Sequence, residues 1–345
     1  MSYPELLPWY QLHKRTLPFR GTHDPYEIWI SEIMLQQTRT ETVAGYYARF
    51  LSRFPNVSAL AAADEQEVLK YWEGLGYYSR ARNLHHAAQL IMEKYNGSFP
   101  KSYEELRSLP GIGDYTAAAI SSIAYQLPFP AIDGNLTRVI SRVHGIREDV
   151  DIPSVRKKIL SLAQQNIDGD MPGDWNQALM DLGATICIPG TPDCSTCPLA
   201  MRCDANAEGD ADLLPLRSAA KPPLPVDVAV GIVTCKDHVL VCRRDAALLR
   251  GLWVFLLSEG DSSPTAFDKL LPSRLLLSEP RFLCEARHVF THRIWNMRIY
   301  HLECALCIPV RGSVWTDLNN LNEFPMPAAM KSARKEAVRL LSAYT

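Results

Sequence analysis

The chain has 345 residues, of which 47% are hydrophobic and 21% charged. This composition is typical of a globular protein and excludes a largely disordered chain, and the length favours about two or three domains. The formal net charge of −2 provides no overall attraction to nucleic acid, so any DNA binding has to depend on local surfaces and backbone donors.

The ends and apolar runs of the sequence give no targeting signal. The N-terminus lacks a basic segment followed by an apolar core, so we expect no signal peptide, and no apolar run approaches the length of a membrane span. Without secretion, we expect the cytoplasm of a bacterium, with the nucleus or a mitochondrion as the eukaryotic alternatives.

The first strong element is a helix expected from Pro25 to about Gln37. Asp24 is suited to cap it, because an Asp followed by proline in the first turn is a common helix start. Glu32 lies in its middle, one turn from Ile28 and Leu35, on a face of large apolar groups. An isolated glutamate there is most often ion-paired or at a rim, but burial would raise its pKa and make it a proton donor.

Further helices are expected near residues 41–53, 64–72, 79–95 and 102–108, the last with a capping box that starts at Ser102. The loop from Trp72 to Arg80 is aromatic, rich in glycine and basic at its end. Such a loop can insert into a base stack, although tyrosines beside glycines more often serve plain packing.

The stretch from residue 109 to residue 135 combines a glycine-rich turn with an acidic residue. Gly111 and Gly113 allow the backbone to lie close to another molecule, and the alanine-rich helix that follows offers a phosphate its unpaired N–H groups. Asp133 stands between Ile132 and a Gly-Asn pair, which is a costly position for a charge unless chemistry uses it. We interpret the stretch as a DNA anchor joined by one helix to a catalytic acid.

Another capped helix is expected to start at Asp174, and a cysteine-rich segment follows it. Four of the nine cysteines lie between residues 187 and 203, and two of them form a Cys-x-x-Cys pair. Four thiolates at this spacing can hold zinc or an iron–sulfur cluster, and the spacing alone does not decide between them. The cysteines are Cys187, Cys194, Cys197 and Cys203.

The amino-acid composition of the sequence changes after the cysteines. Residues 204–225 are rich in small and acidic residues and then in proline, which favours an extended connector. Strands are expected over residues 226–233, 239–242, 252–257 and 298–302, and a terminal helix over 327–344. We therefore predict a helical region followed by a small α+β domain.

Several motifs together resemble the helix-hairpin-helix Gly/Pro-Asp superfamily of DNA glycosylases. Residues 109–113 match its hairpin, residues 133–135 its catalytic loop, and the cysteine spacing that of its iron–sulfur members. Residues 31–38 and 72–80 resemble the adenine DNA glycosylase (MutY) family in particular, and 251–255 resemble the core strand of Nudix (MutT) domains. The resemblance is close over residues 3–210 and looser over 226–345.

The resemblance implies the domains, the substrate and the cofactor. It implies a six-helix barrel with the hairpin over residues 23–127, a cluster domain over 1–22 and 128–210, a linker over 211–225 and a Nudix-like domain over 226–345. The substrate would be duplex DNA in which adenine is mispaired with 8-oxoguanine or guanine, and the cysteines would hold a 4Fe-4S cluster. The chain would act as a monomer.

The resemblance also assigns roles to single residues. Glu32 would protonate the purine and Asp133 would stabilise the sugar cation, with Tyr115 and Asn135 beside the sugar. Endonuclease III relatives carry a lysine where this chain has Tyr115, so strand cleavage is not expected. The glutamate-rich metal-binding helix of Nudix hydrolases is missing after Gly260, which argues against hydrolase activity there. The remaining assignments are Gly111 and Gly113 on a phosphate, Arg20 and Gln177 on the base, and Leu35, Gln37, Tyr77, His288, Phe290, Thr291 and His292 as readers of the opposite base.

Two alternatives remain at this point. One is an endonuclease III-like glycosylase and lyase, which Tyr115 argues against. The other is a non-catalytic iron–sulfur protein that senses DNA lesions and would not need Glu32 or Asp133. From the residues alone, the loop 288–292 could also be an ordinary turn between strands.

Overall fold

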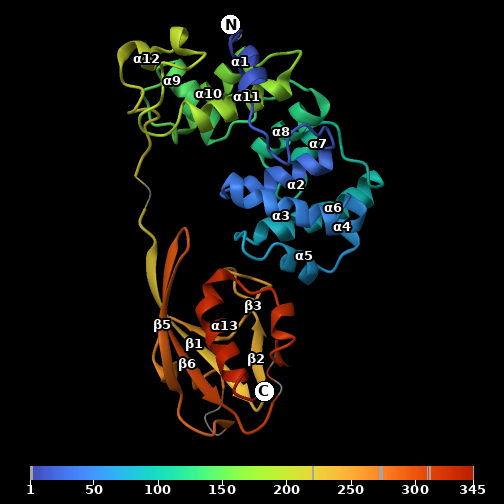
Figure 1. Ribbon diagram of the computed structural model, residues 1–345, viewed down its shortest axis with the longest axis vertical. Coiled ribbons are helices and arrows are strands. Elements are labelled where there is room, and N and C mark those ends of the chain that lie inside the picture. The colour runs from blue at the N-terminus through green and yellow to red at the C-terminus, as the bar shows by residue number, and fades with distance from the viewer. Residues whose placement is uncertain (1–2, 220, 272–274, 309, 311, 345) are drawn as a thin grey trace. The chain divides into compact units, whose positions relative to one another are not determined.

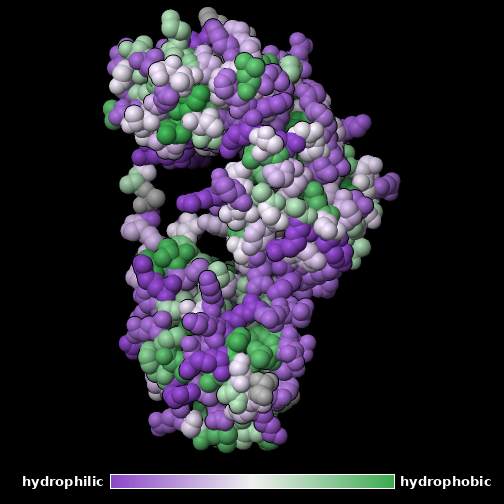
Figure 2. All heavy atoms as spheres, viewed as in Figure 1, coloured by the Kyte–Doolittle hydropathy of each residue, from purple (hydrophilic) through white to green (hydrophobic). Residues whose placement is uncertain are grey.

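The computed structural model describes residues 3–219, 221–271, 275–308, 310 and 312–344. The chain forms two compact units, one made of Met1–Ala62 with Asn83–Ala219 and the other of Ala63–Arg82 with Ala220–Thr345 (Figure 1). Figure 2 shows hydrophilic side chains over most of the viewed face of each unit, interrupted by small hydrophobic patches. Among the described helices, none combines the length and the apolar character that crossing a bilayer requires.

The first unit is helical, as the sequence predicts. Its helix starts follow local chemistry: Asp24 accepts a hydrogen bond from the Tyr26 N–H (2.8 Å), and Ser102 accepts one from the Glu105 N–H (3.2 Å). Most of the described helices belong wholly or mainly to this unit: α1 (Leu6–His13), α2 (Pro25–Leu35), α3 (Thr40–Arg53), α4 (Val57–Ala62), α6 (Ser79–Tyr95), α7 (Tyr103–Arg107), α8 (Asp114–Tyr125), α9 (Gly134–Val143), α10 (Pro153–Asn166), α11 (Pro172–Thr185) and α12 (Asp204–Glu208).

Two helix starts differ from the expectation: the terminal helix begins at Lys331 rather than at Pro327, because Ala328–Met330 form a 3₁₀ turn, and α11 begins early. Helix α11 begins at Pro172, two residues before Asp174, and its N-cap residue Met171 makes no side-chain cap. Proline provides the helical φ at the first position without needing a hydrogen-bond acceptor, so the helix starts earlier than the capping pattern suggests. The Asp174 carboxylate instead accepts a hydrogen bond from the Gln11 amide (3.1 Å).

Helix α8 lies at the centre of the unit and positions the site. It packs against α2, α7 and α11, and its residues Thr116–Ile123 are buried. Small side chains in this run allow the neighbouring helices to approach closely. The buried Asn176 of α11 then fixes the loop after α8, because its amide bonds Ser122, the Ala131 N–H and the Phe129 carbonyl at 2.8–2.9 Å. This loop leads directly to Asp133.

The second unit is built on a mixed sheet of seven described strands. Its order is β3-β2-β1-β6-β5, with β4 paired to β1 and β7 to β2. The long strands β1 and β6 run parallel in continuous register from Leu224↔Arg293 to Thr234↔Glu303. The bounds are β1 (Leu224–Cys235), β2 (His238–Arg243), β3 (Trp253–Val254), β4 (Leu256–Glu259), β5 (Arg281–Val289), β6 (Arg293–Glu303) and β7 (Ser313–Thr316).

Alternate residues of β1 build two apolar layers in this unit. Val228, Val230 and Ile232 pack with the terminal helix α13 (Lys331–Leu341), while Ala229 and Val233 face a second cluster around Phe267. This alternation is the normal consequence of side chains pointing to opposite faces of a strand. The predicted fold class, mainly helical and then α+β, is confirmed. Strands β5 and β7 are additions to the expected set.

Helix α5 (Glu65–Tyr71) belongs to the second unit, although it is far away in sequence. Its Gln66 side chain accepts from the Trp253 indole N–H (2.8 Å) and donates to the Gly251 carbonyl (3.2 Å). Glu73 pairs with Arg334 of α13 at 3.0 Å. Residues 63–82 therefore pack with the C-terminal part of the chain. The predicted boundaries within the helical region stay predictions.

Candidate active site

Glu32 lies inside the helical unit and is 7% exposed. Its Oε2 accepts a hydrogen bond from the Tyr115 hydroxyl at 2.5 Å, which joins α2 to α8. Burial raises the pKa of Glu32, while the Tyr115 hydrogen bond and the Arg20 charge act in the opposite direction. A carboxyl group in this environment holds its proton to a higher pH than an exposed glutamate and can donate it.

Asp133 caps helix α9. Its Oδ1 accepts the Leu136 N–H (2.7 Å) and its Oδ2 accepts the Asn135 amide (2.8 Å). Burial raises the pKa of this carboxyl, and the two hydrogen bonds with the nearby Arg138 partly offset that rise. The carboxylate is thus fixed in direction, and the helix N-terminus beside it favours its charged form.

Asn135 and Arg138 join α9 to α11 behind this carboxylate. The Arg138 guanidinium donates to the Asn135 Oδ1 (2.9 Å) and to the Gly183 carbonyl (2.6 Å). A Cβ atom on Gly183 would lie 2.6 Å from the Cβ of Asn135, so only glycine permits this approach of the two helices. Gly183 and Arg138 are thus supporting residues that the sequence reasoning missed.

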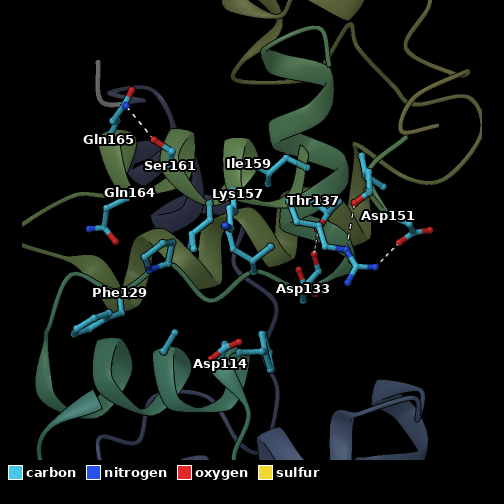
Figure 3. Close-up of a pocket in the computed structure, with 18 of the residues that line it drawn as sticks. Asp114, Phe129, Asp133, Thr137, Asp151, Lys157, Ile159, Ser161, Gln164 and Gln165 are labelled. Atoms are coloured by element: carbon cyan, nitrogen blue, oxygen red, sulfur yellow. Dashed lines mark hydrogen bonds and ion pairs between the residues drawn. The ribbon is translucent and has the colours of Figure 1, made fainter. Parts of the chain in front are cut away.

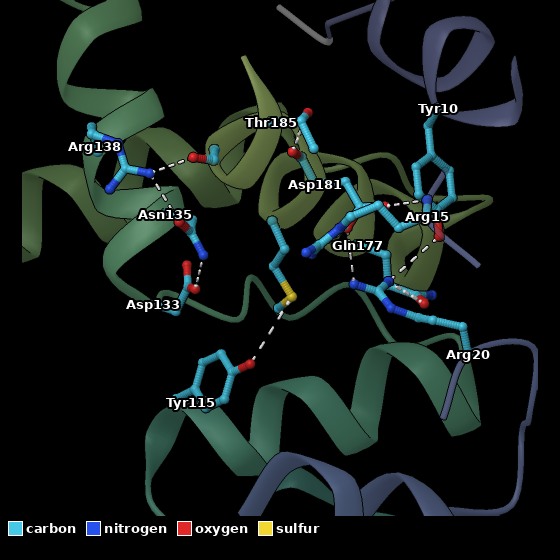
Figure 4. Close-up of polar contacts among 12 residues, drawn as sticks. Tyr10, Arg15, Arg20, Tyr115, Asp133, Asn135, Arg138, Gln177, Asp181 and Thr185 are labelled. Atoms are coloured by element: carbon cyan, nitrogen blue, oxygen red, sulfur yellow. Dashed lines mark hydrogen bonds and ion pairs between the residues drawn. The ribbon is translucent and has the colours of Figure 1, made fainter. Parts of the chain in front are cut away.

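A polar network on the other side of Tyr115 includes Arg20 and Gln177 (Figure 4). Arg20 donates to the Gln177 Oε1 and forms an ion pair with Asp181 at 3.4 Å. Asp181, which is 1% exposed, also pairs with Arg15 at 2.8 Å and accepts the Arg15 backbone N–H. Sequence reasoning missed Asp181 and Arg15. The signal was an acid one turn after Gln177 on the inward face of α11.

A cleft of about 1080 Å³ opens beside these residues (Figure 3). Tyr115 and Asp133 both line it, whereas Glu32 is not among its lining residues and lies deeper. The structure thus brings together an acid with a raised pKa, a tyrosine and an oriented carboxylate. This arrangement of two carboxyl groups in different environments is suited to protonating a leaving group and stabilising a cation at a sugar.

The hairpin that precedes α8 carries the two predicted phosphate contacts. Gly111 has φ +77°, and a Cβ there would lie 2.7 Å from the Asn83 Cβ, so glycine is required. Gly113 has φ −88° and open space around its Cα, so the expected need for glycine in the backbone conformation holds only at Gly111. Gly113 is the N-cap of α8, where a small residue leaves the helix N–H groups accessible.

The four predicted ligand cysteines line one small pocket, together with Arg142. Arg142 is 1% exposed and donates to the Cys187 sulfur (3.3 Å) and to the carbonyls of Ile188 and Gly190 (2.8 and 2.9 Å). In the described residues no three metal-binding side chains are arranged to hold a single metal ion. The four thiols thus line one shared pocket.

The residues predicted to read the opposite base lie in both units. Leu35 ends α2 in the first unit, and Gln37 follows it with φ +59°. In the second unit, Tyr77 is 48% exposed with φ +46°, and its hydroxyl lies 2.7 Å from that of Thr291. The structure thus brings Tyr77 and Thr291 together, although they are 214 positions apart.

The segment 288–292 contains the last two residues of β5 and the turn that leads to β6. Phe290 packs edge-on against His288 (4.5 Å) and Trp295 (5.0 Å between ring centroids), so it has a structural role in the hairpin. Thr291 and His292 are exposed at the tip. The loop is a turn between strands, as one interpretation held, and it also presents two polar side chains outward.

This chain matches two family models and several relatives of known sequence. Residues 30–165 match the family model of the HhH-GPD superfamily base excision DNA repair proteins, and residues 228–336 match that of the NUDIX domain. A protein of Mus musculus named adenine DNA glycosylase is 44% identical, over 97% of this chain and 76% of that protein. A protein of the same name in Homo sapiens is 32% identical, over 94% of this chain and 72% of that protein.

Solved structures resemble the helical part. A thermostable thymine-DNA glycosylase is 29% identical with a TM-score of 0.55, over 60% of this chain and 95% of that one. Endonuclease III in a non-covalent DNA complex is 22% identical with a TM-score of 0.52, over 60% and 94%, and supports the fold alone. Because the mouse and human relatives match over more than two thirds of their length, this chain belongs to the adenine DNA glycosylase family.

Proposed function

We propose that this enzyme removes adenine mispaired with 8-oxoguanine or guanine in duplex DNA, with Glu32 as the acid and Asp133 as the carboxylate at the sugar. As a member of its family it is a base excision repair glycosylase that hydrolyses the N-glycosidic bond of adenine. The observation that best supports the residue roles is the buried Glu32, whose pKa is raised behind Tyr115, next to the cleft that Asp133 lines. The lesion-sensor alternative has no use for that pair.

The adenine must leave the base stack, because its glycosidic bond is not accessible within a duplex. Glu32 then protonates N7, so that the base departs as a neutral group. Asp133 stabilises the positive charge that develops on the sugar, and water completes the hydrolysis. Arg20, which pairs with Asp181, and Gln177, which accepts a hydrogen bond from Arg20, would bind the base. Tyr115 and Asn135 would contact the sugar.

Strand cleavage is not part of the proposal. A lyase needs an amine that forms a Schiff base with the sugar, and Tyr115 has a phenol at the position where endonuclease III relatives carry a lysine. The Tyr115 hydroxyl instead bonds Glu32. We therefore expect an abasic site as the product, without a covalent intermediate that borohydride can trap.

The cysteine pocket is the proposed site of an iron–sulfur cluster. Cys187, Cys194, Cys197 and Cys203 would hold a 4Fe-4S cluster, which would cross-link the segment between α11 and α12. The buried Arg142 adds a positive charge and a hydrogen bond at Cys187, which suits thiolate ligands. A colourless preparation with stoichiometric zinc would contradict this assignment.

The opposite base would be read by Leu35, Gln37, Tyr77, Thr291 and their neighbours His288, Phe290 and His292. Tyr77 is exposed in a backbone conformation that is uncommon for a non-glycine residue, which is frequent at functional loops. We propose that the enzyme acts as a monomer. Since its substrate is genomic DNA, it would work in a bacterial nucleoid, or in a nucleus or mitochondrion.

The test is incubation with a labelled duplex that contains adenine opposite 8-oxoguanine, followed by analysis with and without alkali. We expect a cut strand only after alkali and free adenine in the supernatant. A duplex with adenine opposite guanine tests the second proposed substrate, and a duplex with adenine opposite thymine serves as the specificity control. Cleavage without alkali would support the lyase alternative, and binding without adenine release would support the sensor alternative.

A further inference from the structure

Helix α10 has an unusual charge for this protein. Its fourteen residues, Pro153–Asn166, include Arg156, Lys157 and Lys158 and no aspartate or glutamate, while the whole chain has a net charge of −2. Val155 and Ile159 are buried and attach the helix to the unit. The excess positive charge therefore lies on the exposed side of the helix.

One face of α10 forms a wall of the cleft that contains Tyr115 and Asp133. Lys157, Ser161, Gln164 and Gln165 lie at spacings of about one and two turns, which places them on one side of the helix, and all four line the cleft. Figure 3 shows Lys157 and Gln164 on the α10 side of the cavity and Asp114 on the α8 side. Every side chain in this group can donate a hydrogen bond, and none carries a negative charge.

One of the charges at this wall, that of Lys157, has no carboxylate partner among the described residues. Lys157 makes no hydrogen bond or ion pair with any residue that the structure describes. Arg156 and Arg217 both pair with Asp151, at 2.9 and 3.4 Å, and Arg217 also interacts with the charge of Asp149. By contrast, the next residue on the helix, Lys158, pairs with Glu148 at 3.3 Å and does not line the cleft.

The cleft is larger than one extruded base needs. Its volume of about 1080 Å³ lies at the upper end for pockets that hold whole drug-sized ligands. Asp114 and Tyr115, at the start of α8, line one side of the cleft, and the N-terminus of a helix favours a phosphate. The donors and cations of α10 line the other side, so a sugar–phosphate strand fits between the two walls.

We infer that α10 is a second backbone-binding wall, on which Lys157 binds a phosphate of the strand whose base is extruded. Arg156 and Arg217 add positive charge at the end of the wall. This inference rests on the proposed function, because it takes the ligand of the cleft to be that DNA strand. Phosphate contacts fix the position of a protein on DNA and carry no sequence information. The wall should therefore contribute equally to all duplexes.

The experiment measures the salt dependence of DNA binding for Lys157→Ala and for its matched control Lys158→Ala. The probe is a duplex with 8-oxoguanine opposite a 2′-fluoro-deoxyadenosine, which resists glycosidic cleavage, and a fully paired duplex is measured in parallel. Losing one phosphate contact lowers the slope of log affinity against log salt by about 0.9. We expect this change for Lys157→Ala on both duplexes, with several-fold weaker binding at low salt, and almost none for Lys158→Ala.

Each result bears on the inference separately from the proposed function. If the wild type releases adenine but Lys157→Ala keeps the wild-type slope, the inference is wrong and the proposed function stands. An equal change in Lys158→Ala also overturns it, because the effect would then be general electrostatics. If the wild type releases no adenine, the proposed function fails, whatever the slopes are. Because Lys157 is exposed, unchanged thermal unfolding is expected and excludes misfolding as the cause.

Discussion

Two regions differ in how completely they are assembled in the absence of DNA. One is the candidate active site, and the other is the set of loops proposed to bind the opposite base. In the helical unit, Glu32 and Asp133 each have defined hydrogen-bond partners and raised pKa values caused by burial. In the second unit, Tyr77 and Thr291 are exposed and share one hydrogen bond. A proton donor needs a fixed environment before the substrate arrives, because its pKa is set by that environment. A residue that recognises the opposite base needs exposed surface, because its partner is the base itself.

The largest expected effect is on the chemical side. Asp133→Asn should lower single-turnover adenine release by about 10³-fold, since a neutral amide cannot stabilise the sugar cation. Asparagine is also a good helix N-cap, so α9 and mismatch binding should be retained. Quench-flow release of adenine and a binding titration measure the two quantities. Release within about tenfold of the wild type would remove Asp133 from the mechanism.

The second prediction concerns the carboxylate that holds the base-binding side. Asp181→Asn leaves the partly exposed Arg15 and Arg20 without their shared charge, and the loss of these charged hydrogen bonds should destabilise the protein by about 2 kcal/mol. Urea unfolding measures this difference. Asp174→Asn on the same helix removes only an exposed contact to Gln11 and should cost less than about 0.5 kcal/mol. Equal effects of the two substitutions would show that Asp181 is not a structural anchor.

The third prediction tests how Tyr115 controls Glu32. The Tyr115 hydrogen bond favours the ionised carboxylate, so Tyr115→Phe should raise the pKa of Glu32 further. Because the protonated form donates, activity is lost as the pH rises through this pKa. The alkaline limb of the pH profile should therefore move to higher pH in the variant. A limb that stays in place, or moves to lower pH, would mean that another group limits the rate there.

Contacts in the candidate active site can be predicted from the sequence more readily than contacts among the loops proposed to bind the opposite base, and the reason is physical. Asp133 and the hairpin glycines are local: a cap and a tight turn can be inferred from neighbouring residues. The same holds for the strands β1 and β2, which lie on both sides of a short turn. Contacts such as Tyr77 with Thr291 or Gln66 with Trp253 join segments far apart in the chain, and no local pattern specifies them.

Two further residues show what local patterns leave out. The ion pairs of Asp181 are recognisable only once the segment after α1 is packed against α11, because Arg15 and Arg20 come from that segment. Gly183 resembles any helical glycine until the close approach of Asn135 is seen. The positions of Glu32 and of the four cysteines could be predicted, but the bond from Tyr115 to Glu32 and the support of Cys187 by Arg142 depend on tertiary structure.

The smallest expected effect lies on the reading side and is best measured as a coupling. We expect the hydrogen bond between the hydroxyls of Tyr77 and Thr291 to order the exposed loops. Tyr77→Phe and Thr291→Val should then each weaken binding to an A:8-oxoguanine duplex by about 1 kcal/mol. The double variant should bind only slightly more weakly than either single variant. Thr291→Ser, which keeps the hydroxyl, should bind like the wild type. Fully additive losses would show that the two residues act independently, and the reading side would then be even less organised before DNA binds than its one hydrogen bond indicates.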